Sequence, residues 1–170
     1  MNIRIFGALM IIVGCGAYGF MLSSAYRREL KAISQLLELL GSIECELLYR
    51  GPALSPMLYH LTANRKGLVF DIFRKLAAEL DAQIQPNVSY CMDVALQQFP
   101  NTPSETQRLI QKFGRTLGAF SEEGQLLEIR ALKQEAQHRL SALEADLESK
   151  TKTYQTLGVC AGAAIVVIFM

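Results

Sequence analysis

The sequence contains no tryptophan, and its 170 residues include only two histidines and four cysteines. Without a C-x-x-C pair these cysteines do not form a disulfide scaffold, and two isolated histidines, His60 and His138, do not form a metal site. Seventeen bases against sixteen acids give a net charge of +1, which lacks the basic surplus of a nucleic-acid groove. No phosphate-binding loop with its lysine occurs either. We therefore expect no enzyme, no metal, no cofactor, no small-molecule substrate and no nucleic-acid partner.

Charge is also almost absent from both ends of the chain. No charged residue lies between Ile5 and Ala25, and none follows Thr153. As helices these stretches reach about 31 Å and about 27 Å, close to the roughly 30 Å of a bilayer's hydrocarbon core. We predict a transmembrane helix within residues 1–25, a helical domain at 26–152 and a second transmembrane helix at 153–170.

The bases beside the apolar stretches predict an orientation. These bases are Arg27, Arg28, Lys31, Lys150 and Lys152. The positive-inside rule places them, and with them the central domain, in the cytoplasm. Gly158 and Gly162 are four residues apart, a spacing that lets two membrane helices approach closely. We expect them to pack the two spans together.

Two motifs in the first apolar stretch have other readings. The segment from Gly14 to Gly19 matches G-x-G-x-x-G, but no strand follows it, so a dinucleotide site lacks its βαβ unit. The segment from Ile12 to Cys15 is similar to a lipoprotein cleavage box or the end of a signal peptide. Cleavage there would place the domain outside the cell and its bases on the wrong side, so a retained span is the preferred reading.

Apolar residues in the central region recur at helical spacing, and period-two alternation is nearly absent. Ser55, Ser89 and Thr102 are the expected N-caps, with Thr102 and Glu105 forming a capping box, and Ser121 opens the last helix. The predicted helices cover residues 27–49, 55–64, 67–83, 89–99, 102–118 and 121 onward. The predicted fold is an all-α antiparallel bundle of about six helices, whose long first and last helices extend into the membrane segments.

The first and last of these helices carry long apolar stripes. In the first helix the expected stripe is Leu30, Ile33, Leu37, Leu40, Glu44 and Leu47. In the last helix it is Leu126, Ile129, Leu132, Ala136, Leu140, Leu143 and Leu147. Glu44 interrupts the first stripe, and Glu46 points about 160° away from it, so the two are no acid–base pair. Either Glu44 pairs with a neighbour such as an arginine inside the bundle, or it faces a partner.

Three strings carry a resemblance to a known family. Residues 43–54 read I-E-C-E-L-L-Y-R-G-P-A-L and are similar to the L-E-x-E-I-x-Y-x-x-T-P-L segment of the stage III sporulation protein AB family. Phe113 to Gly118, followed by Gln125, resembles that family's F-G-x-x-L-G … Q. Lys152 to Gly158 resembles its K-x-x-x-x-L-G entry to the last span. The sequence departs from the family pattern at Ala53, where threonine is usual, and after Gly118, where aspartate is frequent.

The resemblance implies a fold like the cytoplasmic domain of the type II secretion inner-membrane platform protein F. It implies a non-enzymatic membrane platform subunit of a sporulation channel between mother cell and forespore. The implied location is the mother-cell membrane around the forespore, and the implied partners are a secretion-type ATPase, other membrane subunits and lipid; homo-oligomerisation is left open. The matched partner-binding positions are Glu44, Glu46, Tyr49, Pro52, Leu54, Gly118 and Gln125.

Other readings remain at this point. Tyr49 and Pro52 can serve only to fix the turn between two helices. The chain can also be a generic two-span adaptor with a helical cytoplasmic domain. A third reading is a soluble ligand-binding or enzymatic helical domain whose apolar ends fold back into its core.

Overall fold

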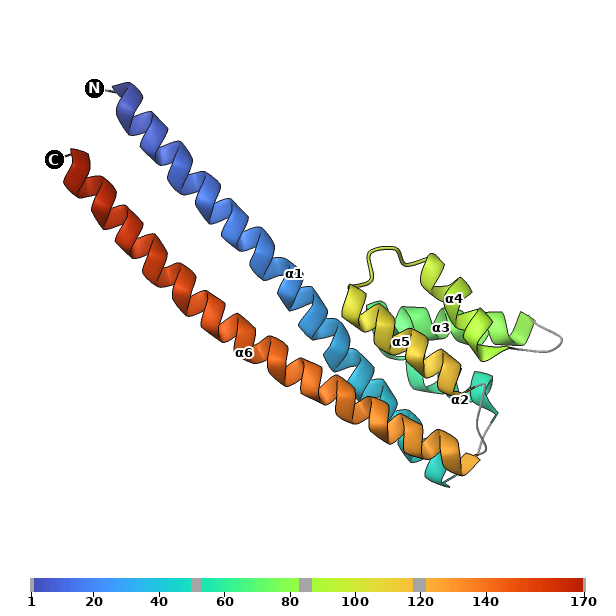
Figure 1. Ribbon diagram of the computed structural model, residues 1–170. Coiled ribbons are helices and arrows are strands. Elements are labelled where there is room, and N and C mark those ends of the chain that lie inside the picture. Colours follow the sequence, from blue (N-terminus) through green and yellow to red (C-terminus); the bar gives the residue numbers. More distant parts are fainter. Residues whose placement is uncertain (1, 50–52, 83–86, 118–121, 170) are drawn as a thin grey trace. The chain divides into compact units, whose positions relative to one another are not determined.

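The structure is a computed structural model, and it describes residues 2–49, 53–82, 87–117 and 122–169. Side-chain surroundings are described for residues 24–49, 53–82, 87–117 and 124–147. The described chain holds six α-helices and no strand (Figure 1), which confirms the all-α prediction. The helices are α1 (Asn2–Tyr49), α2 (Leu54–Thr62), α3 (Leu68–Ala82), α4 (Val88–Gln97), α5 (Ser104–Leu117) and α6 (Glu122–Phe169).

The chain divides into two compact units. Unit 1 comprises residues 1–28 and 141–170, and unit 2 comprises residues 29–140. Within the part of the chain that is described, no helix combines the length and apolarity needed to cross a membrane. The predicted spans at 1–25 and 153–170, with Gly158 and Gly162, lie almost wholly outside the residues whose side chains are described. These spans therefore stay predictions.

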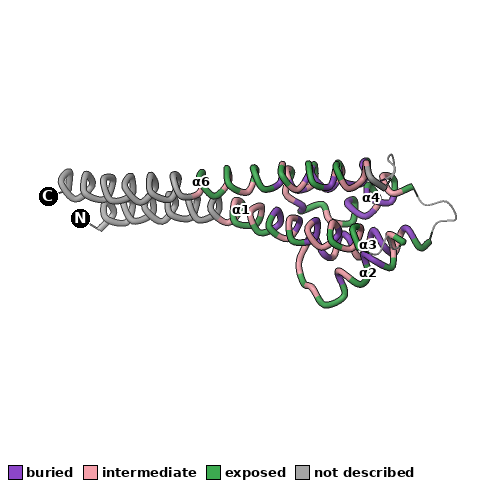
Figure 2. The backbone as a smooth tube through the Cα atoms, turned by 90° about the horizontal axis from the view of Figure 1, so that it is seen from below, coloured by how far each residue is buried: buried purple, intermediate pink, exposed green. Residues whose placement is uncertain are grey.

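The core of unit 2 is built from all six helices. Figure 2 shows its buried positions on the inner sides of the helices and its exposed positions on their outer sides. Phe73 of α3 and Phe113 of α5 are fully buried and meet edge to face, with ring centroids 5.1 Å apart. Such a pair adds about 0.5–1.5 kcal/mol to the burial of its apolar area. The central part of the predicted α6 stripe is confirmed, because Ile129, Leu132 and Ala136 are buried.

The buried face of α1 includes Ile33 and Leu40 of the predicted stripe, which are fully buried, but it differs from the rest of that stripe. Leu36, Leu39 and Ile43 are fully buried, whereas Leu37 and Glu44 are only half-buried. Residues 36–40 contain four leucines, so more than one helical stripe here is similarly apolar. Periodicity alone therefore does not determine which stripe is buried. Packing against α3, α5 and α6 makes the selection.

Two predicted N-caps are wrong. Ala53 occupies the N-cap position of α2, and the hydroxyl of Ser55 instead lies 2.5 Å from a carboxylate oxygen of Asp81 on α3. In α4 the cap is Asn87, whose side-chain oxygen accepts a hydrogen bond from the backbone N–H of Tyr90 at 3.2 Å. Each observed N-cap lies two residues before the predicted serine. Sequence patterns locate the start of a helix only to within one or two residues.

The predicted capping box of α5 is also wrong. The backbone N–H of Glu105 donates to a carboxylate oxygen of Glu29 on α1 at 3.3 Å, and the Thr102 hydroxyl donates to the Phe99 carbonyl at 2.7 Å. An acid near a helix N-terminus is favoured by the helix dipole. The cap therefore comes from a residue 76 positions earlier in the chain.

The start of α3 also lies against α1. Gly67 has a φ of +150°, and a Cβ added there would collide with the side-chain amide of Gln35. The same Gln35 side chain accepts a hydrogen bond from the backbone N–H of Val69 at 3.4 Å. A glycine at this turn thus lets a side chain of α1 reach the first turn of α3.

Candidate docking surface

Glu44 joins α1 to α6 within unit 2. Its Oε1 accepts from Arg130 Nε at 2.7 Å, and its Oε2 accepts from Lys133 Nζ at 3.1 Å. The Glu44 side chain is only 16% exposed. The hydrogen bonds from Arg130 and Lys133 lower the pKa of this carboxyl, although burial acts in the opposite direction. Of the two readings of Glu44, the pairing within the bundle is the one present.

This cluster has more positive than negative charge. Two cations share the single carboxylate of Glu44, so the three groups sum to +1. The interaction of Arg130 with Glu44 uses Nε alone, and its two terminal nitrogens have no partner among the described residues. The Arg130 side chain is 52% exposed. One hydrogen bond thus holds the guanidinium, and its two terminal nitrogens remain as donors.

Large apolar side chains are exposed at the same end of the helix pair. Leu48 is 52% exposed and Leu127 is 67% exposed. Leu48 follows Glu44 by one turn, and Leu127 precedes Arg130 by three residues, so both are displaced in the same direction along the antiparallel pair. Cys45, also exposed, lies three residues before Leu48. We call Cys45, Leu48, Leu127 and Arg130 the seam face.

The structure separates the predicted partner-binding residues. Glu44 and Glu46 lie on opposite flanks of α1, as their spacing requires. Tyr49 is 82% exposed at the end of α1, while Leu54 is half-buried in the first turn of α2. Gln125 donates from Nε2 to the carbonyl of Leu117, the last residue of α5, at 3.3 Å. The two remaining positions, Pro52 and Gly118, lie outside the described residues.

Sequence reasoning missed Leu48, Leu127, Arg130 and Lys133. The signal for Leu127 is that Leu126, Ile129 and Leu132 form the apolar stripe of this helix, and Leu127 lies outside that stripe. For the two bases the signal is their i, i+3 spacing on α6, which puts them on one face. Nothing in the sequence indicates that this face meets Glu44.

The other flank of α6 is tied to α5. Lys112 and Arg108 of α5 bind the carboxylate of Glu135 at 2.7 Å and 3.3 Å, and the Lys112 hydrogen bond lowers the pKa of Glu135. Arg139 lies 3.6 Å from a carboxylate oxygen of Glu105. Because these charges are satisfied within unit 2, this flank is a weaker candidate for docking than the seam face.

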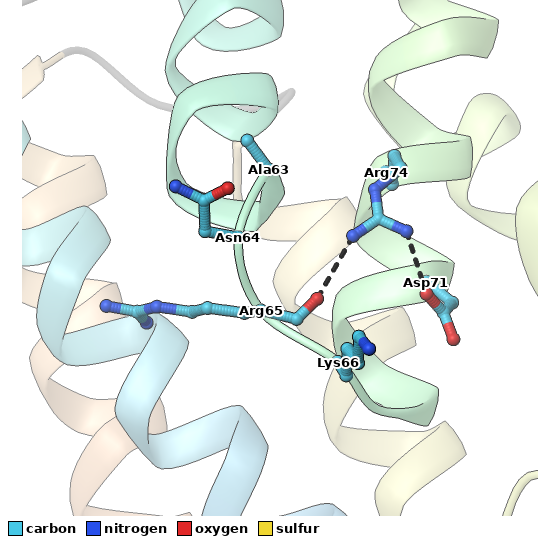
Figure 3. A pocket seen from close by; sticks show the side chains of 6 residues that line it. All are labelled: Ala63, Asn64, Arg65, Lys66, Asp71 and Arg74. Carbon is cyan, nitrogen blue, oxygen red and sulfur yellow. Dashed lines mark hydrogen bonds and ion pairs between the residues drawn. The ribbon is translucent and has the colours of Figure 1, made fainter.

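A surface pocket lies at the turn between α2 and α3 (Figure 3). Its residues are Ala63, Asn64, Arg65, Lys66, Asp71 and Arg74. Arg74 binds Asp71 at 2.9 Å and the carbonyls of Thr62 and Arg65 at 2.6 Å and 3.1 Å. Its guanidinium therefore holds the end of α2 against α3. Arg65 extends away from the pocket and pairs with Glu38 at 3.3 Å. Both arginines of the pocket thus make contacts that stabilise the fold.

Potential reactive groups do not gather in the described part of the chain. No group of three or more His, Cys, Asp or Glu side chains there is placed to hold a metal ion. Cys91 is fully buried, and burial raises the pKa of its thiol. His60 and His138 are exposed and lie on different helices.

Comparisons with known proteins agree with the resemblance seen in the sequence. The family model for stage III sporulation protein AB matches residues 4–170. The stage III sporulation protein AB of Bacillus subtilis (strain 168) is 25% identical over 175 residues, which cover 99% of each chain. A solved structure of a stage III sporulation protein AB superposes with a TM-score of 0.64 at 18% identity, over 71% of this chain and 97% of that one. That likeness shows a shared fold, and the family match extends it along the chain: this protein belongs to the stage III sporulation protein AB family.

Proposed function

We propose that this protein is a non-enzymatic platform subunit of a sporulation complex, and that unit 2 docks a cytoplasmic secretion-type ATPase. Membership of the stage III sporulation protein AB family supports the sporulation role. In this proposal the apolar ends sit in the mother-cell membrane around the forespore. The generic two-span adaptor is the alternative, and no observation favours it.

The observation that carries the docking role is the seam face. Leu48 and Leu127 are about half or more exposed beside a cation whose terminal nitrogens lack a partner among the described residues. Arginine is enriched among interface hot spots, and neighbouring contacts such as these leucines exclude water from it. Tyr49, 82% exposed at the end of α1, adds an aromatic side chain of the type enriched in such interfaces.

Binding of the purified ATPase to the full-length chain in detergent tests this function. We expect Leu127→Glu and Tyr49→Glu each to weaken binding by about tenfold or more, because a charge in place of an apolar contact must be desolvated at the interface. Tyr90→Glu is the matched control, since Tyr90 on α4 is also an exposed tyrosine, at 59%. Full binding by both Leu127→Glu and Tyr49→Glu, with an unchanged helical circular dichroism spectrum, would exclude docking at this end of the α1–α6 pair.

A second variant distinguishes the two flanks of α1. Glu46 was matched to the family motif, yet it lies on the flank opposite Glu44. If Glu46→Lys abolishes ATPase binding while Leu127→Glu leaves it intact, the docking surface is the Glu46 flank and our assignment to the seam face is wrong. We expect the reverse: Leu127→Glu weakens binding, and Glu46→Lys keeps it.

A further inference from the structure

Arg130 is held in place through one nitrogen, and its two terminal nitrogens are available to donate hydrogen bonds. Nε donates to Glu44 at 2.7 Å, which restrains the guanidinium. The terminal nitrogens meet no acceptor among the described residues, and the side chain is 52% exposed. A guanidinium in this state is pre-organised, so less side-chain entropy is lost when it binds an anion.

The surroundings of Arg130 contain cations and apolar groups. The side chains that flank it along the outer side of α6 are Leu127, Lys133 and Gln134. On α1, Gly41 lies close to the Lys133 ammonium, Cys45 and Leu48 are exposed, and Glu44 is already shared by two cations. With a local sum of +1, this surface attracts a negative group and repels a positive one.

We propose that the docking partner inserts a carboxylate between Arg130 and the apolar side chains of Leu48 and Leu127. This inference rests on the proposed function and names the chemistry of the partner's surface: an Asp or Glu side chain flanked by apolar residues. The carboxylate pairs with the terminal nitrogens of Arg130 in a charge-assisted, two-pronged contact. Lys133 contributes positive charge, and the leucines exclude water from the pair.

Four single variants of the full-length chain test this inference through the affinity for the purified ATPase. We expect Arg130→Gln to weaken binding about tenfold or more, and Arg130→Lys to give an intermediate loss because lysine keeps the charge but not the planar fork. Arg139→Gln is the matched control: it removes the same charge from α6 on the flank that faces Glu105. We expect it to bind within about twofold of wild type.

Glu44→Gln separates partner contact from a structural role. This change breaks the same ion pair as Arg130→Gln but leaves both cations in place. If Arg130 touches the partner, Glu44→Gln loses clearly less affinity than Arg130→Gln, because both cations remain and the amide oxygen of glutamine can still accept a hydrogen bond from Arg130 Nε. Equal losses in Glu44→Gln and Arg130→Gln would mean that only the ion pair matters, and would overturn the inference.

The remaining outcomes are equally decisive. If Leu127→Glu weakens ATPase binding and Arg130→Gln does not, docking at the seam face stands and the carboxylate partner is wrong. If wild type does not bind the ATPase, both the docking role and this inference fail. If Arg130→Gln changes only the self-association of the chain, measured by light scattering, the face is an interface between copies and the inference is again overturned.

Discussion

At the scale of single residues, Glu44 illustrates how one side chain can serve two tasks. It is an acid on the edge of an apolar helix face, and it closes the α1–α6 pair by binding Arg130 and Lys133. The same two bonds fix Arg130 for a contact with a partner. Surface-near ion pairs of this kind contribute about 0.2–1 kcal/mol each. The ion pairs of Glu44 therefore matter more for the position of the Arg130 side chain than for the stability of the fold.

The lowered pKa of Glu44 gives a pH-dependent prediction. The folded chain holds this carboxyl ionised more strongly than the unfolded chain does, so its contribution is complete above the ordinary pKa of 4.5. The contribution is lost as pH falls through the lowered pKa of the folded state. We expect Glu44→Gln to reduce the free energy of unfolding by about 1 kcal/mol at neutral pH, and by progressively less below about pH 4.

Urea denaturation of the full-length chain, followed by circular dichroism at several pH values, measures this difference. Glu128→Gln is the control, because Glu128 has no ion pair among the described residues. A difference between wild type and Glu44→Gln that stays constant from neutral to strongly acidic pH would contradict the assignment of the stabilising charge to Glu44.

At the scale of secondary-structure elements, unit 2 contains contacts in which a side chain of one helix binds an unpaired backbone group at the end of another. Glu29 of α1 binds the first turn of α5, and Gln125 of α6 binds the carbonyl of Leu117 at the other end of α5. Helix ends carry unpaired backbone groups, and satisfying them from a neighbouring helix fixes both position and register. Gly114 adds a close approach, because a Cβ there would lie 2.9 Å from the Cβ of Met92 on α4.

The cap supplied by Glu29 predicts an unequal pair of mutations. We expect Glu29→Ala to lower the free energy of unfolding by about 1 kcal/mol, because the N–H of Glu105 loses its acceptor and the dipole of α5 its nearby acid. Thr102→Ser keeps the hydroxyl that binds Phe99 and should have a smaller effect. Denaturant unfolding of the full-length variants measures both, and an unchanged free energy of unfolding in Glu29→Ala would contradict the cap supplied from α1.

At the scale of the whole molecule, different observations support the roles proposed for the two units. Unit 2 has a described core and a candidate docking surface, whereas the membrane role proposed for the chain ends rests on their sequence. Cys45 is exposed on the seam face, while Cys91 is buried. A thiol reagent can therefore report the side of the membrane on which unit 2 lies, but only through Cys45.

We predict that Cys45 is labelled from the cytoplasmic side alone. In a variant with Cys15→Ser and Cys160→Ser, a membrane-impermeant maleimide should leave intact cells unlabelled and should modify Cys45 once the membrane is opened. Cys91 should react only after unfolding, since burial shields its thiol and raises the thiol's pKa. Labelling of Cys45 in intact cells would place unit 2 outside and would support the signal-peptide reading of Cys15.

Helical periodicity and breakers were sufficient to predict most of the elements. Ile72, Leu76 and Leu80 recur at helical spacing and are buried in α3, and α3 begins and ends within one residue of the predicted limits. The all-α class follows from the same local patterns, because a spacing of three or four residues is a property of the chain itself. The family resemblance was likewise readable from short strings such as Phe113–Gly118, of which Phe113 lies in the core.

The caps and the candidate site were decided by tertiary structure. Glu29 caps a helix 76 residues away, and Glu44 meets Arg130 across 86 residues, distances in sequence that no local pattern encodes. Packing also selected Leu36 and Ile43 for the core, while leaving Leu48 and Leu127 exposed. The sequence by itself determined where helices form, since backbone hydrogen bonds and apolar spacing are local; which faces meet, and what remains free to bind, depends on long-range contacts that exist only in the folded chain.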